Sequence, residues 1–166
     1  IHGVRFRGVP SFVIELDKSV VIPEMGRVNY DLAYGGAFYA YVDLDRNDFE
    51  LELDPSGYRD LIDLGMKIKH AVIGQRPPVH PFEPDLSFLY GTIFIGPSKK
   101  SGIDSRNVCV FADGEVDRCP TGTGVSARLA LHHARGEIGL HEPIVVESIL
   151  GTRFTGQVEP VGHEEV

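Results

Sequence analysis

One short segment gathers residues that could bind and react with a small molecule. Asp117 and Cys119 stand shortly before residues 121–124, a Thr-Gly-Thr-Gly run that leads into an apolar segment. The first N–H groups of a helix have no partners inside it and carry partial positive charge. Glycines let a ligand approach the backbone closely, and threonine hydroxyls can cap the helix or donate to the ligand. The segment therefore predicts a cradle for a small carboxylate or phosphate.

Spacing alone leaves other interpretations of this segment open. The run could be a helix N-cap after a tight turn, without any ligand. A phosphate loop of the Walker type is less well supported, because no lysine follows the glycines. Asp117 could bind a substrate cation or pair with Arg118, although exposed carboxylates near turns usually do neither.

The cysteines and histidines do not form a metal-binding or redox pattern. Cys109 and Cys119 are the only two cysteines and are not in a Cys-x-x-Cys pair, so both are expected to be free thiols. Cys109 lies in an apolar run and is expected to be buried and structural. His132 and His133 fall within a predicted helix, where a packing or surface role is expected rather than metal binding.

Composition and charge limit the class of partner. The 166 residues are 42% hydrophobic, which is enough for one globular domain. A net charge of -8 with scattered Lys and Arg would repel a phosphate backbone, so nucleic acid is not an expected partner. The sequence has neither a run of about 20 apolar residues nor a signal-peptide pattern, so we expect a cytoplasmic protein and no membrane partner. The start at Ile1 suggests a chain cut from a longer one.

Two helices and a set of short strands must position the reactive segment. Asp54 and Pro55 are typical of a helix start, and apolar residues follow at helical spacing from Leu61 to Val72. A second helix is predicted over 124–135, apolar around most of its circumference and ended by Gly136. Turn signals, including one at Asp17-Lys18, separate the strands. Strands are predicted at 4–6, 12–14, 20–22, 28–32, 37–42, 86–95, 107–111, 144–150 and 152–158. This pattern predicts an α+β fold with a curved antiparallel sheet around a central helix.

The reactive segment resembles a known family signature. Residues 117–124 read Asp-Arg-Cys-Pro-Thr-Gly-Thr-Gly, and Ser126-Ala127-Arg128 follows. This is similar to the Asp-Arg-Ser-Pro-Cys-Gly-Thr-Gly motif of the proline racemase family. Further family-like segments lie at 9–12, 33–36, 38–40, 90–94 and 110–113. The resemblance thus covers nearly the whole chain.

The resemblance implies a fold like that of diaminopimelate epimerase, with two pseudo-symmetric lobes. Each lobe is a barrel-like sheet around a central helix, and the substrate lies between the lobes. Residues 1–166 are expected to be the second lobe only, without the first lobe and without a C-terminal tail. Family members use no metal and no cofactor. Their racemases carry one cysteine in each lobe, as base and acid on opposite faces of the α-carbon.

Thr121 decides the expected branch of the family. It stands where racemases and hydroxyproline epimerases have the second cysteine, and this substitution resembles the trans-3-hydroxy-L-proline dehydratases. A threonine hydroxyl is too weak an acid and base to exchange a carbon-bound proton, whereas a thiol with a pKa of about 8.5 can be tuned to do so. Elimination needs only one base, which the first lobe would supply, while Thr121 would bind the departing hydroxide or a water.

The remaining site roles follow from the same resemblance. The backbone N–H groups of Gly122 and Thr123 would bind the carboxylate of the imino acid. Asp117 would hold the ring ammonium, and Phe111 would pack against the ring. Cys119 replaces a serine, and we expect Pro120 to direct it away from the cleft. Ala37 stands where relatives often have asparagine.

Two other functions stay open. A hydroxyproline 2-epimerase or proline racemase would keep the fold but would need a second working thiol. Alternatively, the lobe is a binding or structural module without catalysis. The isolated chain is expected to be inactive, and it could form a homodimer through the apolar face that a first lobe would otherwise cover.

Overall fold

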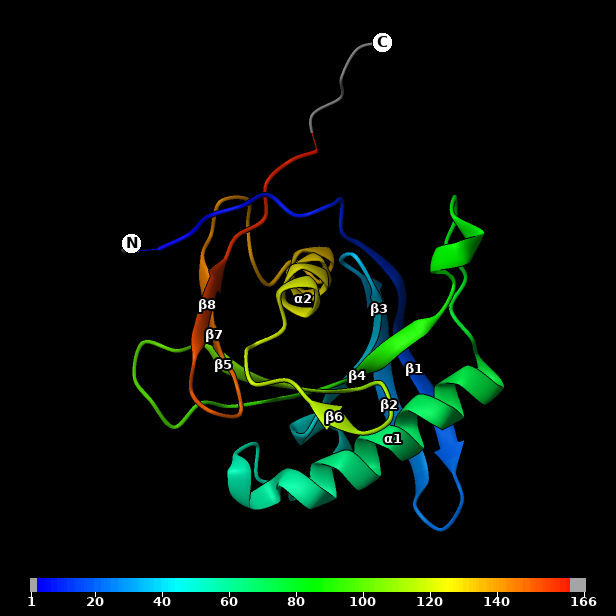
Figure 1. The fold of residues 1–166 in the computed structure, drawn as a ribbon. Helices are drawn as coiled ribbons and strands as arrows, with labels where there is room; N and C mark the ends of the chain where they lie inside the picture. Colours follow the sequence, from blue (N-terminus) through cyan, green and yellow to red (C-terminus); the bar gives the residue numbers. More distant parts are fainter. Residues whose placement is uncertain (1–2, 162–166) are drawn as a thin grey trace.

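The computed structural model describes residues 3–161, which form one curved mixed sheet with a helix on each side (Figure 1). The start at Ile1 lies outside the described residues. The strands are β1 (Phe12–Ile22), β2 (Gly26–Tyr34), β3 (Phe38–Asp43), β4 (Leu89–Gly96), β5 (Ser105–Phe111), β6 (Glu115–Val116), β7 (Ile144–Glu147) and β8 (Arg153–Gly156). The helices are α1 (Tyr58–Gln75) and α2 (Gly122–Ala134), and short 3-10 turns lie at Asp45–Asn47, Pro55–Gly57 and Pro84–Leu86. The α+β class is therefore confirmed.

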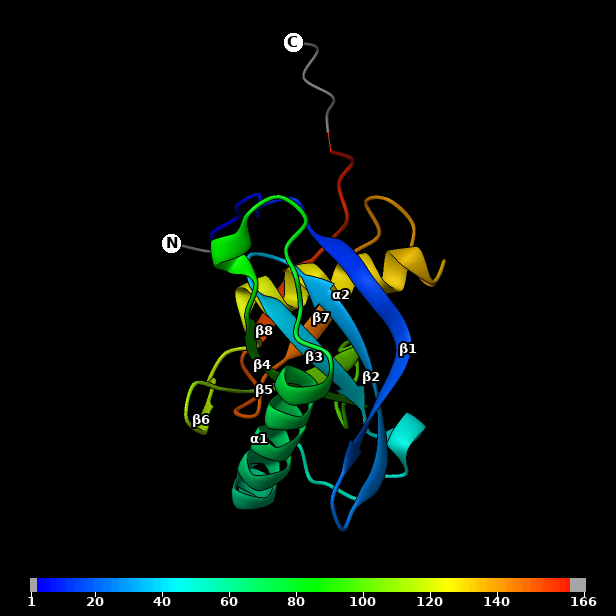
Figure 2. The ribbon, with the colours of Figure 1, turned by 90° about the vertical axis from the view of Figure 1, so that its right-hand side faces the viewer.

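The sheet wraps around α2, while α1 covers its outer face. Its strand order is β1-β2-β3-β4-β5-β7-β8, with β6 paired to β5. Figures 1 and 2 both place α1 and α2 on opposite sides of the sheet. The larger core packs α1 against β1 to β5, and two smaller cores pack α2 against the inner face. The reactive segment thus leads into the helix that the sheet encloses.

The prediction of an antiparallel sheet was wrong in two places. β3 pairs with β4 in parallel, and β5 pairs with β7 in parallel. Each of these pairs is joined by a connection that contains a helix, α1 for the first and α2 for the second. Such a crossover brings the chain back to the end of the sheet at which the first strand began, so the two strands run parallel. The barrel-like shape is also incomplete, because within residues 3–161 β1 and β8 stand at opposite ends of the strand order and do not pair.

Strand β1 continues through a predicted turn. Asp17 has a positive φ of 55°, yet the strand runs unbroken from Phe12 to Ile22. Its register with β2 shifts between Val13 and Glu15 and again between Glu15 and Lys18. The turn signal at Asp17 is therefore absorbed as a bulge, which bends a strand without ending it. The strand predicted at 4–6 does not form: residues 3–10 run as irregular chain, with Phe6 74% exposed.

The predicted helix start at Asp54 and Pro55 forms a 3-10 turn that leads into α1. The Asp54 carboxylate accepts a hydrogen bond from Ser56 N at 2.8 Å and so caps this turn, whereas α1 itself begins at Tyr58 without a side-chain cap. The predicted apolar stripe of α1 is fully buried. α2 begins two residues earlier than predicted and is followed by Gly136 at φ +71°. Neither helix in the described part of the chain is long and apolar enough to span a membrane.

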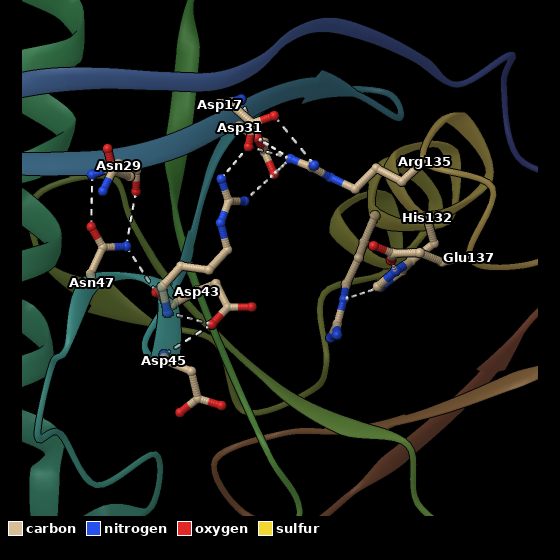
Figure 3. A network of polar contacts seen from close by, with 11 residues as sticks. Asp17, Asn29, Asp31, Asp43, Asp45, Asn47, His132, Arg135 and Glu137 are labelled. Atoms are coloured by element: carbon tan, nitrogen blue, oxygen red, sulfur yellow. Dashed lines mark hydrogen bonds and ion pairs between the residues drawn. The ribbon is translucent and has the colours of Figure 1, made fainter.

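A carboxylate and arginine network fixes the C-terminal end of α2 to the sheet (Figure 3). Arg135 donates to both oxygens of the buried Asp31 on β2, at 2.8 and 2.9 Å, and to Asp17 on β1. Arg46 also bonds to Asp31 and Asp17. Because a buried carboxylate needs such partners, the network makes the position of α2 relative to β1 and β2 specific.

Candidate active site

A cavity of about 550 Å³ opens at the N-terminal end of α2. Four separate parts of the chain meet there: the irregular segment before β1, the β2–β3 turn, the start of β4, and the loop that leads into α2. The lining residues are Phe6, Gly8, Val9, Gly35, Gly36, Ala37, Tyr39, Tyr90, Asp117, Thr121, Gly122, Thr123 and Ser126. The cavity therefore combines a polar floor at α2 with apolar and glycine-rich walls.

Asp117 organises the turn in front of α2. Its Oδ2 accepts the Thr121 hydroxyl at 2.9 Å, and its Oδ1 accepts the Cys119 N–H at 3.3 Å and the Cys119 thiol at 3.4 Å. Thr121 has φ +69°, a conformation that costs a non-glycine residue on the order of 1–3 kcal/mol. The hydrogen bonds to the charged carboxylate offset this strain, and they hold the Thr121 side chain at the cavity with 6% exposure.

The first backbone N–H groups of α2 follow directly on this turn. The first hydrogen bond of α2 runs from Val125 N to Thr121 O at 2.8 Å. Among the described residues, none accepts from the N–H groups of Gly122, Thr123 or Gly124. Gly122 and Thr123 also line the cavity, so two unpaired donors stand at the positive end of the helix beside it. This arrangement can bind a small anion.

Neither thiol faces the cavity. Cys109 is buried on β5, and burial raises its pKa to about 12. Burial also raises the pKa of Cys119, and the thiol's hydrogen bond to Asp117 acts in the same direction. The Cys119 sulfur accepts the Thr121 N–H at 3.3 Å, inside the turn. Both cysteines are free thiols, as predicted, and both are held in the protonated form.

Two glycines allow the β2–β3 turn to lie directly on α2. A Cβ at Gly35 would stand 2.3 Å from Thr123 O and 2.5 Å from Ala127 N. Gly36 has φ +114°, and a Cβ there would lie 2.8 Å from Thr123 Cγ2. The sequence predicted a turn at these two glycines but gave them no role at the cavity. Their missing side chains bring the wall and the floor of the cavity together.

Comparison with known proteins assigns this arrangement to a family. Residues 1–164 match the family model described as Proline racemase. The chain belongs to the proline racemase family. A trans-3-hydroxy-L-proline dehydratase of Colwellia psychrerythraea is 52% identical over 155 residues, which cover 93% of this chain and 43% of that protein. A 3-hydroxyproline 2-epimerase of Burkholderia multivorans is 43% identical, over 93% of this chain and 46% of that protein.

The fold is shared with solved structures of the proline racemase family. A hydroxyproline epimerase from Agrobacterium vitis, solved with bound trans-4-hydroxy-L-proline, superposes with a TM-score of 0.82 at 38% identity. The superposition covers 89% of this chain and 42% of that one. The chain thus spans less than half the length of the curated relatives and of the structure that it matches.

The structure brings together four of the five residues predicted from the proline racemase family motif. Asp117, Thr121, Gly122 and Thr123 all line the cavity. Phe111 is not among the lining residues. It lies behind Tyr90, with the two rings stacked at 5.4 Å and 10°. Tyr90 therefore occupies the wall where Phe111 was expected, and Phe111 supports it.

Sequence reasoning missed the aromatic hydroxyl at this cavity. The Tyr39 hydroxyl lies 2.7 Å from Thr123 Oγ1, although its ring is 1% exposed. The alternation of β3 would have placed Tyr39 on the face opposite Phe38, but no pattern in the sequence pairs it with Thr123. Within residues 3–161, no group of three or more His, Cys, Asp or Glu side chains is placed to hold a metal ion. That the reaction needs no cofactor stays a prediction.

A buried arginine supports the turn from behind. Arg128 on α2 is 3% exposed and donates to Asn107 Oδ1 at 2.7 Å and to His132 Nε2 at 3.0 Å, neither of which is a carboxylate. Burial lowers the Arg128 pKa to about 10, so the guanidinium stays charged at neutral pH. Asn107 Nδ2 in turn donates to Pro120 O at 3.4 Å. Arg128 on α2 and Asn107 on β5 are thus connected to Pro120, the residue before Thr121.

Replacing Asn107 by alanine should destabilise the chain and loosen this turn. The buried Arg128 guanidinium would lose its shortest hydrogen bond, and bonds to charged groups contribute about 1.5–3 kcal/mol. We expect a loss of that size in urea unfolding. Arg118→Ala, at an exposed side chain, is the control and should change stability by less than about 0.5 kcal/mol. Equal stability of the two variants would contradict a supporting role for Asn107.

Proposed function

We propose that the complete protein is a trans-3-hydroxy-L-proline dehydratase and that this chain is the second of its two lobes. One observation carries the proposal: Thr121 stands at the cavity beside Asp117, and no described cysteine lines the cavity. Without a second thiol, this lobe cannot exchange a proton on the second face of the α-carbon. Removal of one α-proton followed by elimination remains feasible. The 52% identity to a relative described as such a dehydratase supports the same choice.

The substrate would bind with its carboxylate at the α2 N-terminus. The N–H groups of Gly122 and Thr123 would donate to the carboxylate, and fixed donors there would make the α-proton more acidic as negative charge develops. Asp117 would hold the ring ammonium with the lone pairs that Thr121 and Cys119 leave available. Phe111 would act through Tyr90, which is stacked on it and would pack against the substrate ring. A base in the first lobe would remove the α-proton, and the enamine product would become an imine.

In the complete protein, the first lobe would close the cavity from its open side, since both lobes would be of the diaminopimelate epimerase type. The isolated chain would then lack the base and half of the cleft, and it would show no turnover. Its exposed Phe6 and Val9 beside the cavity would favour a homodimer in place of the lobe contact. A cytoplasmic location stays a prediction.

The test is incubation of the full-length protein with trans-3-hydroxy-L-proline. Loss of water should be seen by mass spectrometry, with the imine product trapped by an amine reagent. L-Proline and trans-4-hydroxy-L-proline, which have no hydroxyl at the β-carbon, are the controls. Inversion of either control substrate, with no loss of water from the 3-hydroxy compound, would establish the racemase or epimerase alternative. No reaction with any of the three would favour a non-catalytic lobe.

Replacing Thr121 by cysteine in the full-length protein should add epimerase activity. The new thiol would stand where Thr121 now lies, and a thiol can exchange the α-proton where an alcohol cannot. We expect deuterium from D₂O to enter trans-4-hydroxy-L-proline at the α-carbon with inversion, at least about 10²-fold above the parent. Cys119→Ser is the matched control and should leave loss of water unchanged, because its sulfur lies in the turn. Loss of turnover in the control would show that Cys119 takes part in the chemistry.

A further inference from the structure

Elimination of water leaves one step without an assigned group, because the departing hydroxide needs a proton. The need for this proton rests on the proposed function. Two of the hydroxyls that line the cavity have already committed their protons within the protein. Thr121 donates to Asp117 Oδ2 at 2.9 Å, and Ser126 donates to Gly122 O at 3.1 Å. Thr121 can therefore accept a hydrogen bond from the substrate, but it has no proton left to donate.

Tyr39 and Thr123 form a hydroxyl pair that retains one proton for a ligand. Their oxygens lie 2.7 Å apart, so one of the two protons fills the hydrogen bond between them and the other stays available. Thr123 is exposed at the cavity, while Tyr39 is 1% exposed and held by edge contacts of its ring with Tyr41 and Tyr90. The pair thus presents the Thr123 hydroxyl to the cavity with a phenol directly behind it.

The two members of the pair differ in acidity. A phenol has a pKa of about 10, and an aliphatic alcohol is a far weaker acid. Burial raises the pKa of Tyr39 further, so it is protonated throughout the neutral range. Hydroxide is the stronger base, because water has a pKa of about 15.7. Proton transfer from the pair to a departing hydroxide is therefore downhill.

We propose that the Thr123 hydroxyl protonates the departing oxygen of the substrate and that Tyr39 replaces the proton that Thr123 gives up. The α-proton goes to the first-lobe base, and the electrons of its C–H bond form the new C=C bond. The C–O bond breaks with its electron pair on oxygen. The oxygen takes the Thr123 proton and leaves as water, and the proton shared with Tyr39 moves onto Thr123. The buried Tyr39 phenolate regains its proton from Thr123, which takes one in turn from solvent that enters the open cavity.

Tyr90 is the competing donor at this cavity. Its hydroxyl group is on a ring that is 37% exposed and stacked on Phe111. A donor open to solvent is less well fixed toward the substrate than one that is already hydrogen-bonded to Thr123. Tyr90→Phe is therefore a matched control for Tyr39→Phe: both changes remove one phenolic oxygen from a residue that lines the cavity.

The experiment compares two leaving groups in the full-length protein. The parent, Tyr39→Phe, Thr123→Val and Tyr90→Phe are assayed with trans-3-hydroxy-L-proline and with trans-3-fluoro-L-proline, since fluoride leaves without needing a proton. We expect Tyr39→Phe and Thr123→Val to lose about 10²-fold in kcat with the hydroxyl substrate, the usual contribution of a general acid. Both should stay within about threefold of the parent with the fluoro substrate, which also shows that they fold. Tyr90→Phe keeps the ring that lines the cavity, so any loss in this variant should be the same with both substrates.

Each other result decides against the proposal in a recognisable way. Equal losses with both substrates would mean that Tyr39 and Thr123 only position the substrate. Normal water loss in Tyr39→Phe would exclude the phenol as the proton source, and a hydroxyl-specific loss in Tyr90→Phe would assign that role to Tyr90. If the parent releases neither water from the hydroxyl substrate nor fluoride from the fluoro substrate, the proposed function itself fails. If the parent loses water and the variants do too, only this inference fails.

Discussion

Replacing Gly35 by alanine is expected to displace the cavity wall, destabilise the fold and lower turnover. The added Cβ would stand 2.3 Å from Thr123 O and 2.5 Å from Ala127 N, and both are backbone atoms of α2 that cannot rotate away. Overpacking of this kind costs about 3 kcal/mol at the upper end of its usual range. A shift of the β2–β3 turn by about 1 Å can also lower turnover by about 10²-fold. Thermal unfolding measures the loss of stability, and the water-loss assay proposed above for the full-length protein measures the loss of turnover.

Gly74 provides the control for this substitution. It lies in α1, and no heavy atom stands within 4 Å of the position that a Cβ would take, so alanine meets open space there. Alanine is favoured over glycine in a helix, and Gly74→Ala should raise stability by up to about 1 kcal/mol. An unchanged melting temperature and normal turnover in Gly35→Ala would mean that the turn does not lie against α2 as described.

Replacing Glu147 by glutamine should cause the largest loss of stability away from the cavity. The Glu147 side chain is fully buried on β7, and its carboxylate accepts from Arg106 at 2.6 and 3.0 Å, from Ser98 at 2.7 Å and from Lys100 at 3.0 Å. Arg106 also donates to Leu53 O, so the cluster joins β5 and β7 to the segment before α1. Removing one partner of a buried ion pair leaves the other uncompensated, and we expect a loss of about 3 kcal/mol in urea unfolding of the chain.

The pH dependence of unfolding tests the same cluster. Burial alone would raise the pKa of Glu147, but hydrogen bonds from Ser98, Lys100 and Arg106 lower it to about 2. A carboxyl whose pKa is lower in the folded state stabilises the fold above its unfolded pKa of about 4.3, and this contribution is lost as the pH falls towards 2. The stability difference between the parent and Glu147→Gln should therefore shrink between pH 5 and pH 2.

An exposed ion pair supplies the control for Glu147. Lys99 and Glu52 lie 3.1 Å apart, with side chains 81% and 60% exposed. Exposed pairs contribute little, so Glu52→Gln should change stability by less than about 0.5 kcal/mol. A constant difference between parent and Glu147→Gln at every pH would indicate that the Glu147 charge does not stabilise the fold.

Local sequence patterns were sufficient for the features that depend on neighbouring residues. The apolar stripe from Leu61 to Val72 and the stop at Gly136 were confirmed, and Asp54 caps the 3-10 turn that leads into α1, because helical spacing and capping act within a few residues. The motif at 117–124 likewise located the N-terminus of α2 and the family. What the sequence could not specify is which backbone direction each strand takes, since strand pairing depends on contacts between distant residues.

Only the tertiary structure decided the parallel pairs, the burial of Arg128 and the partners of Tyr39. Arg128 is the strongly polar residue of an apolar helix, and a charged side chain is usually exposed; here Asn107, 21 residues away, satisfies it inside the fold. Tyr39 and Thr123 are 84 residues apart and meet because Gly35 and Gly36 let the β2–β3 turn lie on α2. The sequence by itself determined the helices and the motif, because these depend on short-range geometry. The arrangement of the cavity depends on long-range packing, which no local pattern encodes.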